Sequence, residues 1–410
     1  SGDLISSTAG TSNFRAGVNA GNSIQSGGNY NVVLGDEAGT ALTTGDNNVF
    51  VGYAAGDATT TGPNNTAVGY QALSTNTTGD TNTAVGKDAM LANTTGTNNA
   101  AFGTRSLDAN TTGSSNVALG DQALSANTTA DNNVAVGTSS LGANTTGASN
   151  SAFGANTLAA NTTASNNTAM GYNAGTAVTT GTENTVVGAL AGDAITTGNE
   201  NTAVGKTALS ADTKGHRSVA IGQGTLATQN FTSSTNAYNT AVGFQAGNAV
   251  TTGVQNTIIG ALAGDALTDA DTNVAIGVSA LGADTLGSSS VAIGSSALRL
   301  QNFTSATDVY NVAIGRAAGE NVTTGVRNTF IGGLAGDALT TGLDNVAMGK
   351  SALSAETSGA RSVAIGANSL TAQNVGSGTA VYNTAVGYDA GYSVTTGTNN
   401  VIVGGLAGDA

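Results

Sequence analysis

A five-residue pattern of polar and apolar positions recurs along almost the whole chain. It reads Asn, a β-branched residue, a small residue, an apolar residue and Gly, as in the segment 65–69. From Gly35 to Gly404 successive copies keep a 17-residue spacing, except at three places where it is a 21-residue spacing. A strict period of this length indicates one turn of chain repeated as a stack. The sequence therefore predicts an all-β, parallel β-solenoid over residues 30–410, with one coil per copy and no α-helical domain.

The order of side chains within the pattern predicts which of them face the interior. We number each coil from its Gly as position 1, so the Asn stands at position 14 and the apolar residue at position 17. Alternate residues of a strand point to opposite faces, so positions 15 and 17 share one face and position 16 takes the other. Position 16 is usually Ala, so we expect a small-residue outer face there and a buried position 17. Examples at position 17 are Val68, Val85, Phe102, Leu119, Ile221, Ile293 and Met348.

Position 14 carries a polar column. It is Asn in nineteen copies and Ser in three, at Ser218, Ser290 and Ser362. Stacked Asn side chains can hydrogen-bond from coil to coil, and Asn also tolerates the backbone geometry of turns. We expect an amide ladder along the stack; the alternative is that Asn serves only as a turn residue.

A second strand is expected around positions 4 to 10, where the repeat has two forms. Where position 5 is Leu, position 8 is polar, as in Leu107 with Asn110; where position 5 is Gly, position 8 is apolar, as in Gly39 with Leu42. Gly56 with Thr59 is the exception. Close packing accounts for this exchange if each coil holds one large apolar side chain at these positions. We therefore expect Leu42, Leu73 and Leu107 to be buried.

Longer periods divide the chain into three regions. Residues 1–29 are expected to form an irregular or capping coil, and residues 30–170 regular 17-residue coils. Residues 171–410 are expected to form 72-residue blocks of three short coils and one long coil, which restart at Gly171, Gly243, Gly315 and Gly387.

The extra residues of the long coils are expected to bulge outward near Phe231, Phe303 and Val375. Aromatic residues on such bulges are candidate surface contacts. The alternative is that Phe231 and Tyr238 fold back over the core. The candidates are Phe231, Phe303, Tyr238, Tyr310 and Tyr382.

Composition and charge exclude several classes of protein. The regular register of Val, Ile and Thr argues against disorder, and a single Pro without Gly at every third position excludes collagen. The formal net charge of −14 makes nucleic acid an unexpected partner. No apolar run is long enough to span a membrane. The chain starts at Ser1 and stops inside a repeat, so we expect it to be a segment of a longer protein.

Residues that could carry chemistry are few, and we expect no catalytic, cofactor or metal site. The single His216 has no nucleophile or carboxylate partner in a recognisable pattern. The Asp of Ala-Gly-Asp-Ala recurs mostly once per block, as at Asp193 and Asp265, too far along a stack for shared calcium ligation. The Asn-Thr-Thr segments match a glycosylation sequon, although a structural role in a stacked corner explains them better; they begin at Asn76, Asn93, Asn110, Asn127, Asn144 and Asn161.

Some copies of the pattern resemble those of a known family. The segments 218–222, 290–294 and 362–366, each reading Ser-Val-Ala-Ile-Gly, resemble the head repeats of YadA-type trimeric autotransporter adhesins. The segment 65–73 is similar to repeats of phage tail-fibre-like and bacterial surface proteins. This resemblance implies a left-handed parallel β-roll, three chains around one axis and a role in attachment. Both the short and the long coils of this chain are longer than the coils of the adhesin heads.

These observations favour a structural function. A coil this short buries little apolar surface, so we expect the chain to associate with copies of itself, intertwined or side by side. The resemblance implies a homotrimer, and a dimer or larger bundle is the alternative. The expected protein is a non-enzymatic fibre shaft or adhesin head, extracellular on a cell or virion surface, with an unknown cell-surface or host receptor. The alternative is an ice-binding or other surface-layer solenoid. Adjacent Thr residues, instead of Thr-x-Thr pairs, argue against ice binding.

Overall fold

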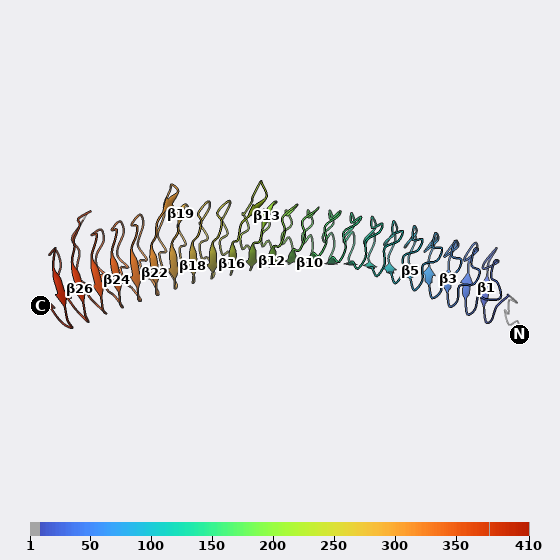
Figure 1. The fold of residues 1–410 in the computed structure, drawn as a ribbon, viewed down its shortest axis with the longest axis horizontal. Coiled ribbons are helices and arrows are strands. Elements are labelled where there is room, and N and C mark those ends of the chain that lie inside the picture. The colour runs from blue at the N-terminus through green and yellow to red at the C-terminus, as the bar shows by residue number, and fades with distance from the viewer. Residues whose placement is uncertain (1–8, 377, 410) are drawn as a thin grey trace. The chain divides into compact units, whose positions relative to one another are not determined.

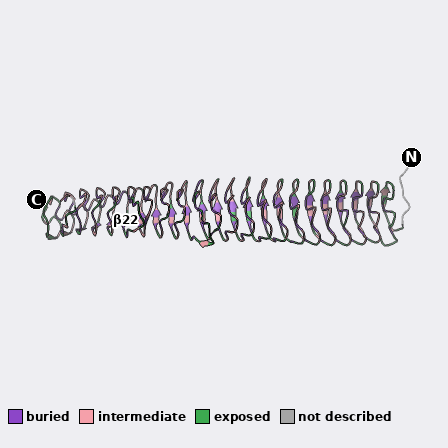
Figure 2. Ribbon diagram, turned by 90° about the horizontal axis from the view of Figure 1, so that it is seen from above, coloured by how far each residue is buried: buried purple, intermediate pink, exposed green. Residues whose placement is uncertain are grey.

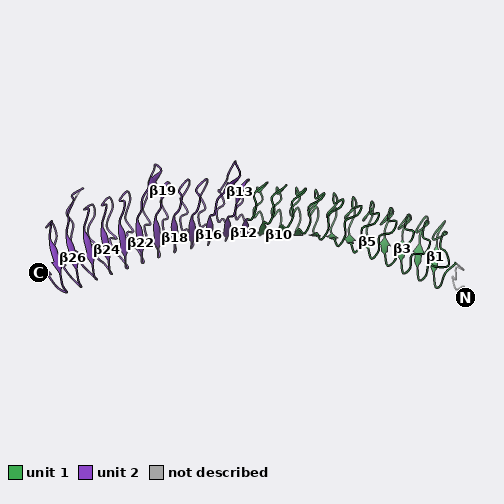
Figure 3. Cartoon of the chain, viewed as in Figure 1, with its two compact units in different colours: residues 1–200 green, residues 201–410 purple. Residues whose placement is uncertain are grey.

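The computed structural model describes residues 9–376 and 378–409, and every regular element in that part of the chain is a β-strand. The chain forms two compact units, residues 1–200 and 201–410 (Figure 3). In each unit the strands of successive coils lie side by side and parallel (Figure 1). The predicted parallel β-solenoid with one coil per repeat is confirmed.

Residues 9–200 of the first unit contain eleven strands of three residues each. They are β1 Phe14–Ala16, β2 Val32–Leu34, β3 Val49–Val51, β4 Thr66–Val68, β5 Thr83–Val85, β6 Ala100–Phe102, β7 Val117–Leu119, β8 Val134–Val136, β9 Ser151–Phe153, β10 Thr168–Met170 and β11 Thr185–Val187.

The described residues of the second unit, 201–376 and 378–409, contain twelve strands of the same kind and four shorter ones. The three-residue strands are β12 Thr202–Val204, β14 Val219–Ile221, β16 Thr240–Val242, β17 Thr257–Ile259, β18 Val274–Ile276, β20 Val291–Ile293, β22 Val312–Ile314, β23 Thr329–Ile331, β24 Val346–Met348, β25 Val363–Ile365, β26 Thr384–Val386 and β27 Val401–Val403. The two-residue strands are β13 Gly215–His216, β15 Thr235–Asn236, β19 Gly287–Ser288 and β21 Thr307–Asp308.

The pairing register follows the sequence repeat. Thr66 pairs with Thr83 in the next coil, and Ala67 pairs with Ala84. A long coil keeps this register, because Val219 of β14 pairs with Thr240 of β16 across the extra residues. Those residues leave the stack as loops that protrude beside β13 and β19 (Figure 1), where β13 pairs with β15 and β19 with β21. The predicted outward bulges of these two coils are therefore present.

The second strand expected at positions 4 to 10 is wrong. These residues form consecutive turns, because positions 3 and 5 adopt left-handed backbone conformations, as at Gln71 (φ 54°) and Leu73 (φ 55°). Coil-to-coil hydrogen bonding continues through the turns: the Leu73 N–H donates to the Ala89 carbonyl at 2.9 Å. Stacking of the coils thus satisfies the backbone hydrogen-bonding groups of these residues, although they do not have extended strand geometry.

The expected direction of the strand side chains is also wrong. Position 16 points inward, and Ala67, Ala84 and Ala101 are fully buried. Position 17 points outward, so Leu119 is 47% exposed and Val68, Phe102, Ile221 and Met348 are exposed as well. Figure 2 shows buried residues within the strands, flanked by less buried ones. The reason is volume: Leu at position 5 already fills the narrow interior, which leaves room only for Ala opposite it.

Packing of the coil interior explains the two forms of the repeat. The Leu residues at positions 5 and 8, including Leu42, Leu73 and Leu107, are fully buried as predicted. A large residue at position 16 occurs where position 5 is Gly in both that coil and the next. Phe50 is the clearest case, since a Cβ on Gly39 would lie 3.0 Å from its ring and one on Gly56 would lie 2.7 Å from it. Phe50 therefore fills the space left by both glycines. Thr59, the exception at position 8 of the following coil, accepts a hydrogen bond from Asn76 Nδ2 at 3.4 Å.

The Gly that ends each repeat has a separate role. Gly69 has φ +138°, and a Cβ there would overlap the carbonyl oxygen of Gly86 in the next coil. Only a residue without a side chain allows the coils to approach this closely at that corner.

We predict that two leucines of the same region differ sharply in their effect on stability. Leu107→Ala should lower the free energy of unfolding by about 2–5 kcal/mol, because it empties a buried site. Leu119→Ala should cost under about 1 kcal/mol in the isolated chain, since its side chain faces outward. Urea unfolding followed by circular dichroism tests the pair at a concentration where light scattering gives the mass of the single chain, and equal losses for the two variants there would contradict the inward and outward assignment.

Candidate functional site

The outward surface of the strands is the first candidate site, and we call it the strand face. It consists of the side chains at positions 15 and 17. From Val32 to Val403 these positions hold only Val, Ile, Leu, Met, Phe, Thr, Ala and Ser, so the strand face carries no charge. Its exposed large residues include Phe102, Leu119, Phe153, Met170, Ile259, Ile314 and Ile365. An exposed apolar surface repeated in this way makes the strand face a candidate interaction surface.

Two polar columns hold the corner beside the strands. At position 14 the Asn65 Oδ1 accepts the backbone N–H of Asn82 at 2.9 Å, and the Asn82 Nδ2 donates to the Gly96 carbonyl at 2.8 Å. The predicted ladder is present, although it runs through backbone groups as well as amides. At position 8 a second ladder is formed directly between amides, as where Asn93 Nδ2 donates to Asn76 Oδ1 at 2.9 Å.

The second ladder accounts for the sequons. All six Asn residues that begin Asn-Thr-Thr are fully buried, and they are Asn76, Asn93, Asn110, Asn127, Asn144 and Asn161. The following Thr hydroxyl is also used: Thr77 Oγ1 donates to the Thr94 carbonyl at 3.0 Å. These segments are therefore structural, as expected.

In the short coil before each long coil, position 8 holds a buried carboxylate. Asp284 Oδ1 accepts the backbone N–H groups of Gly287 and Phe303 at 3.0 Å each, and its Oδ2 accepts Gln301 Nε2 at 2.6 Å. Gln301 Nε2 also donates to Ser290 Oγ at 3.0 Å. The carboxylate thus fixes the base of the protruding loop by charge-assisted hydrogen bonds.

The same arrangement occurs at all three long coils. Asp212 with Gln229 and Ser218 repeats it before β15, and Glu356 with Gln373 and Ser362 repeats it before β26. The role of these acids was missed from the sequence. The available signal was an acid at position 8, where other coils have an amide, an apolar residue or, in one coil, Thr59, followed by Gln at position 8 of the next coil.

The five aromatic candidates separate into two groups. Phe231 and Phe303 are 5% and 8% exposed, so these two residues are not the exposed contacts considered from the sequence. The physical reason is that each backbone N–H is drawn inward to the buried carboxylate, which places Phe231 against Gly215 at the base of the loop. By contrast Tyr238, Tyr310 and Tyr382 are 48%, 56% and 51% exposed. The alternative that residues fold back over the core thus applies to Phe231 but not to Tyr238.

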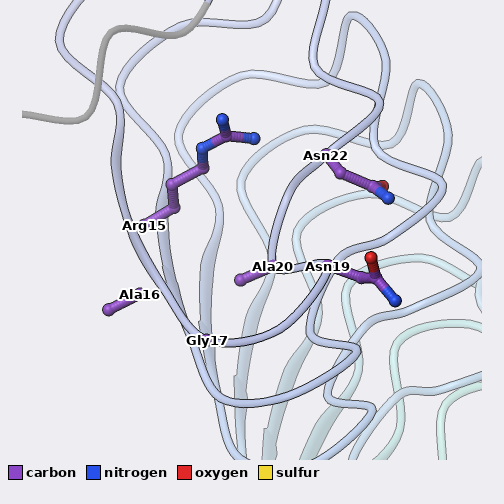
Figure 4. Close-up of a pocket in the computed structure, with 6 residues that line it drawn as sticks. All are labelled: Arg15, Ala16, Gly17, Asn19, Ala20 and Asn22. Carbon is purple, nitrogen blue, oxygen red and sulfur yellow. The ribbon is translucent and has the colours of Figure 1, made fainter.

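Other candidate chemistry is distributed along the stack. The His216 Nε2 lies 2.8 Å from Ser234 Oγ at the first protruding loop. Within residues 9–376 and 378–409 no group of three or more His, Cys, Asp or Glu residues could hold a metal ion. Shallow hollows occur in the same range; one is lined by Arg15, Asn19 and Asn22 in the first coil (Figure 4), and another by Asp265 and Arg299.

Several aspartates at position 6 are partly removed from water. Burial raises the pKa of the carboxyls of Asp57, Asp108, Asp193, Asp265 and Asp337 above the ordinary value of 3.8. In Asp57, Asp108, Asp193 and Asp337 one carboxylate oxygen is buried without a hydrogen-bond partner. Their charged form is therefore less favourable in the folded protein than in the unfolded chain.

Comparison with known proteins gives no assignment: no family model and no curated protein matches this chain. Within the part of the chain that the structure describes, no helix has the length and apolarity needed to cross a membrane.

We predict that Asp284→Asn destabilises the second unit. The amide can accept fewer N–H groups than the carboxylate and places its own N–H₂ against donors, so the loss should be about 2–3 kcal/mol. Urea unfolding measures it. The matched control is Asp308→Asn, an exposed residue on β21 of the same loop, which should change stability by less than about 0.5 kcal/mol. A neutral Asp284→Asn would show that the carboxylate does not hold the loop.

The position 6 aspartates predict the direction of a pH dependence. A raised folded-state pKa means that stability increases as pH falls through that pKa, and the gain is complete below the unfolded value near 3.8. The thermal midpoint should therefore rise between pH 7 and about pH 4.5. Asp265→Asn with Asp337→Asn should reduce that rise, because two of the titrating groups are removed. A midpoint that falls over this interval would contradict the assignment.

Proposed function

We propose that the chain is a structural, non-enzymatic segment of a surface fibre, located outside the cell or on a virion, which assembles with copies of itself and provides reach and attachment. The observation that carries the proposal is the strand face. It exposes apolar side chains in successive coils. Exposed apolar surface of this extent is rare in a protein that acts as an isolated chain.

The occupant of the strand face that fits best is a second copy of the same chain. Each coil presents the same pair of positions at about the 4.8 Å spacing of parallel strands, so only a partner with the same rise can meet every coil in register. Three chains placed with these faces together would bury them around a common axis. This replaces the Ala surface expected from the sequence, which lies in the interior.

Charge supports the same partner. The chain carries a formal net charge of −14, which would keep copies apart if the charges lay in the contact. The strand face has none of them, so copies can meet there and leave the acids in water. A uniform stack joined in this way is suited to hold a receptor-binding region at a distance.

A surface-layer or ice-binding solenoid is the second candidate. The outward direction of the strand residues favours this candidate, whereas the pattern of Thr residues in the sequence argued against it. Thr66 and Thr83 at position 15 stand beside Val68 and Val85 on the outward face. However, the larger side chains of Phe102, Leu119 and Phe153 interrupt this row. The strand face therefore differs from the regular array that would be needed to order water. A thermal hysteresis measurement separates the candidates, since a fibre should give none.

We predict that the protein is a homotrimer of the 39.4 kDa chain and that the strand face holds it together. Phe102→Asp combined with Phe153→Asp should shift the mass measured by light scattering towards that of the single chain, because charge is costly in an apolar contact. Thr112→Asp is the control, since Thr112 is exposed at a turn of the coil. A wild-type protein that is monomeric at micromolar concentration, or a double variant that assembles normally, would refute the proposal.

A further inference from the structure

A row of five side chains, four exposed and one half-buried, runs along one edge of the second unit. We call it the Tyr–Arg row, and it consists of Tyr310, Arg327, Asp344, Arg361 and Tyr382. Each stands one residue before the Asn or Ser of position 14 in five consecutive coils. All five have left-handed backbones, with φ between 54° and 63°, so they leave the stack from equivalent corners. At about 4.8 Å per coil the row extends for about 19 Å.

The centre of the row is an ion-paired triad. Arg327 Nε and Nη2 donate to Asp344 Oδ1 and Oδ2 at 2.6 and 3.2 Å, and Arg361 Nε lies 3.7 Å from Asp344 Oδ2. The hydrogen bonds from Arg327 hold the pKa of Asp344 below its ordinary value, so its carboxylate remains charged. One carboxylate faces two guanidinium groups, and the triad therefore keeps one positive charge in a chain whose net charge is −14.

The second arginine is held in place by a tyrosine. Arg361 Nη1 donates to the Tyr382 hydroxyl oxygen at 3.1 Å, and the guanidinium carbon lies 5.7 Å from the centre of the ring. Such a cation–π contact orients the guanidinium plane. The side chains of Arg327 and Arg361 are still 53% and 48% exposed, so N–H groups of both remain available to solvent.

We propose that the Tyr–Arg row binds an acidic saccharide, with the two guanidinium groups on anionic substituents and the terminal tyrosines on sugar rings. The inference names the ligand class for the attachment role proposed above and rests on that role. Arg327 and Arg361 are two coils apart, about 10 Å. That spacing suits a polymer in which acidic and neutral sugars alternate, and Asp344 between them can accept hydroxyl groups of the neutral sugar.

Other classes of polyanion fit the row less well. A nucleic acid carries a charge on every nucleotide, so a phosphate would face Asp344, and the acidic chain around the row would repel the rest. A peptide that binds by strand addition needs free backbone groups. At the row these N–H groups are used between coils: Arg327, Asp344 and Arg361 donate to the carbonyls of Val309, Val326 and Leu343. A saccharide needs only exposed side chains and ring faces.

Calorimetric titration of the full chain at physiological ionic strength tests the inference. The probes are a hyaluronan hexasaccharide, whose only anionic groups are carboxylates, a chondroitin sulfate hexasaccharide, which carries carboxylates and sulfates, and the neutral hexamer of N-acetylglucosamine, called chitohexaose below. The wild type should bind an acidic probe and not chitohexaose. Binding of both acidic probes assigns the carboxylate that they share, whereas binding of chondroitin sulfate alone assigns the sulfate.

Variants then locate the site. Arg327→Gln with Arg361→Gln should weaken binding about tenfold or more, and the corresponding Lys pair should give a smaller loss because charge remains without the planar fork. Arg316→Gln is the matched control, an exposed arginine of the same unit outside the row. Circular dichroism checks the fold of each variant. If the Gln pair is unstable, the loss of affinity in the Lys pair tests the site instead.

Several results would overturn the inference: no binding of either acidic probe, equal binding of chitohexaose, an unchanged affinity in the Gln pair, or tighter binding of poly-glutamate or single-stranded DNA. Light scattering on the same samples separates this inference from the proposed fibre. A monomeric wild type that binds an acidic probe would refute the assembly alone, whereas a trimer that binds neither acidic probe would refute the saccharide site alone.

Discussion

The narrow interior of the coil is the constraint on which the rest of this structure depends. A single short coil encloses space for a Leu at position 5 against an Ala at position 16, or for a larger residue such as Phe50 or Phe330 between two glycines. Interiors packed to this density accept neither an additional methylene nor a void without a loss in stability. Every large residue that the interior cannot hold must therefore face outward, and this is how the strand face acquires its apolar character.

The same constraint explains how the chain tolerates polar groups inside. The amides at positions 8 and 14 are buried, and most of them bond to groups of neighbouring coils, with Asn48 Nδ2 and Asn161 Oδ1 as exceptions. Stacking thus supplies most of the partners that burial requires. In the short coil before each long coil, position 8 holds an acid instead of an amide or an apolar residue. Asp284 accepts two backbone N–H groups and one amide N–H there, which an Asn in the same place could not do. The protruding loop is thus built on a buried carboxylate and not on its exposed residues.

These features give the surface two distinct regions. The strand face is apolar, uncharged and continued in each coil, which is what association with identical chains requires. The Tyr–Arg row is charged, local and present once in five consecutive coils, which is what recognition of a particular ligand requires. Charge is also distributed unevenly: residues 1–200 have three basic and thirteen acidic residues, whereas residues 201–410 have eight and twelve. The proposed roles of assembly and binding thus depend on different residues and can be tested separately.

The sequence by itself determined the repeat, the parallel stacking, the polar ladder and the burial of Leu42, Leu73 and Leu107, because each follows from a period that local pattern alone reveals. It did not determine which side of the strand faces inward, since strict alternation is consistent with either direction and hydrophobicity favoured Val68 and Leu119. Only the tertiary structure decided this, because the free volume opposite Ala67 depends on Leu73 of the next coil. The Tyr–Arg row likewise brings together residues from different coils, such as Arg327 with Asp344 and Arg361 with Tyr382, and their contacts exist only because successive coils place equivalent corners side by side.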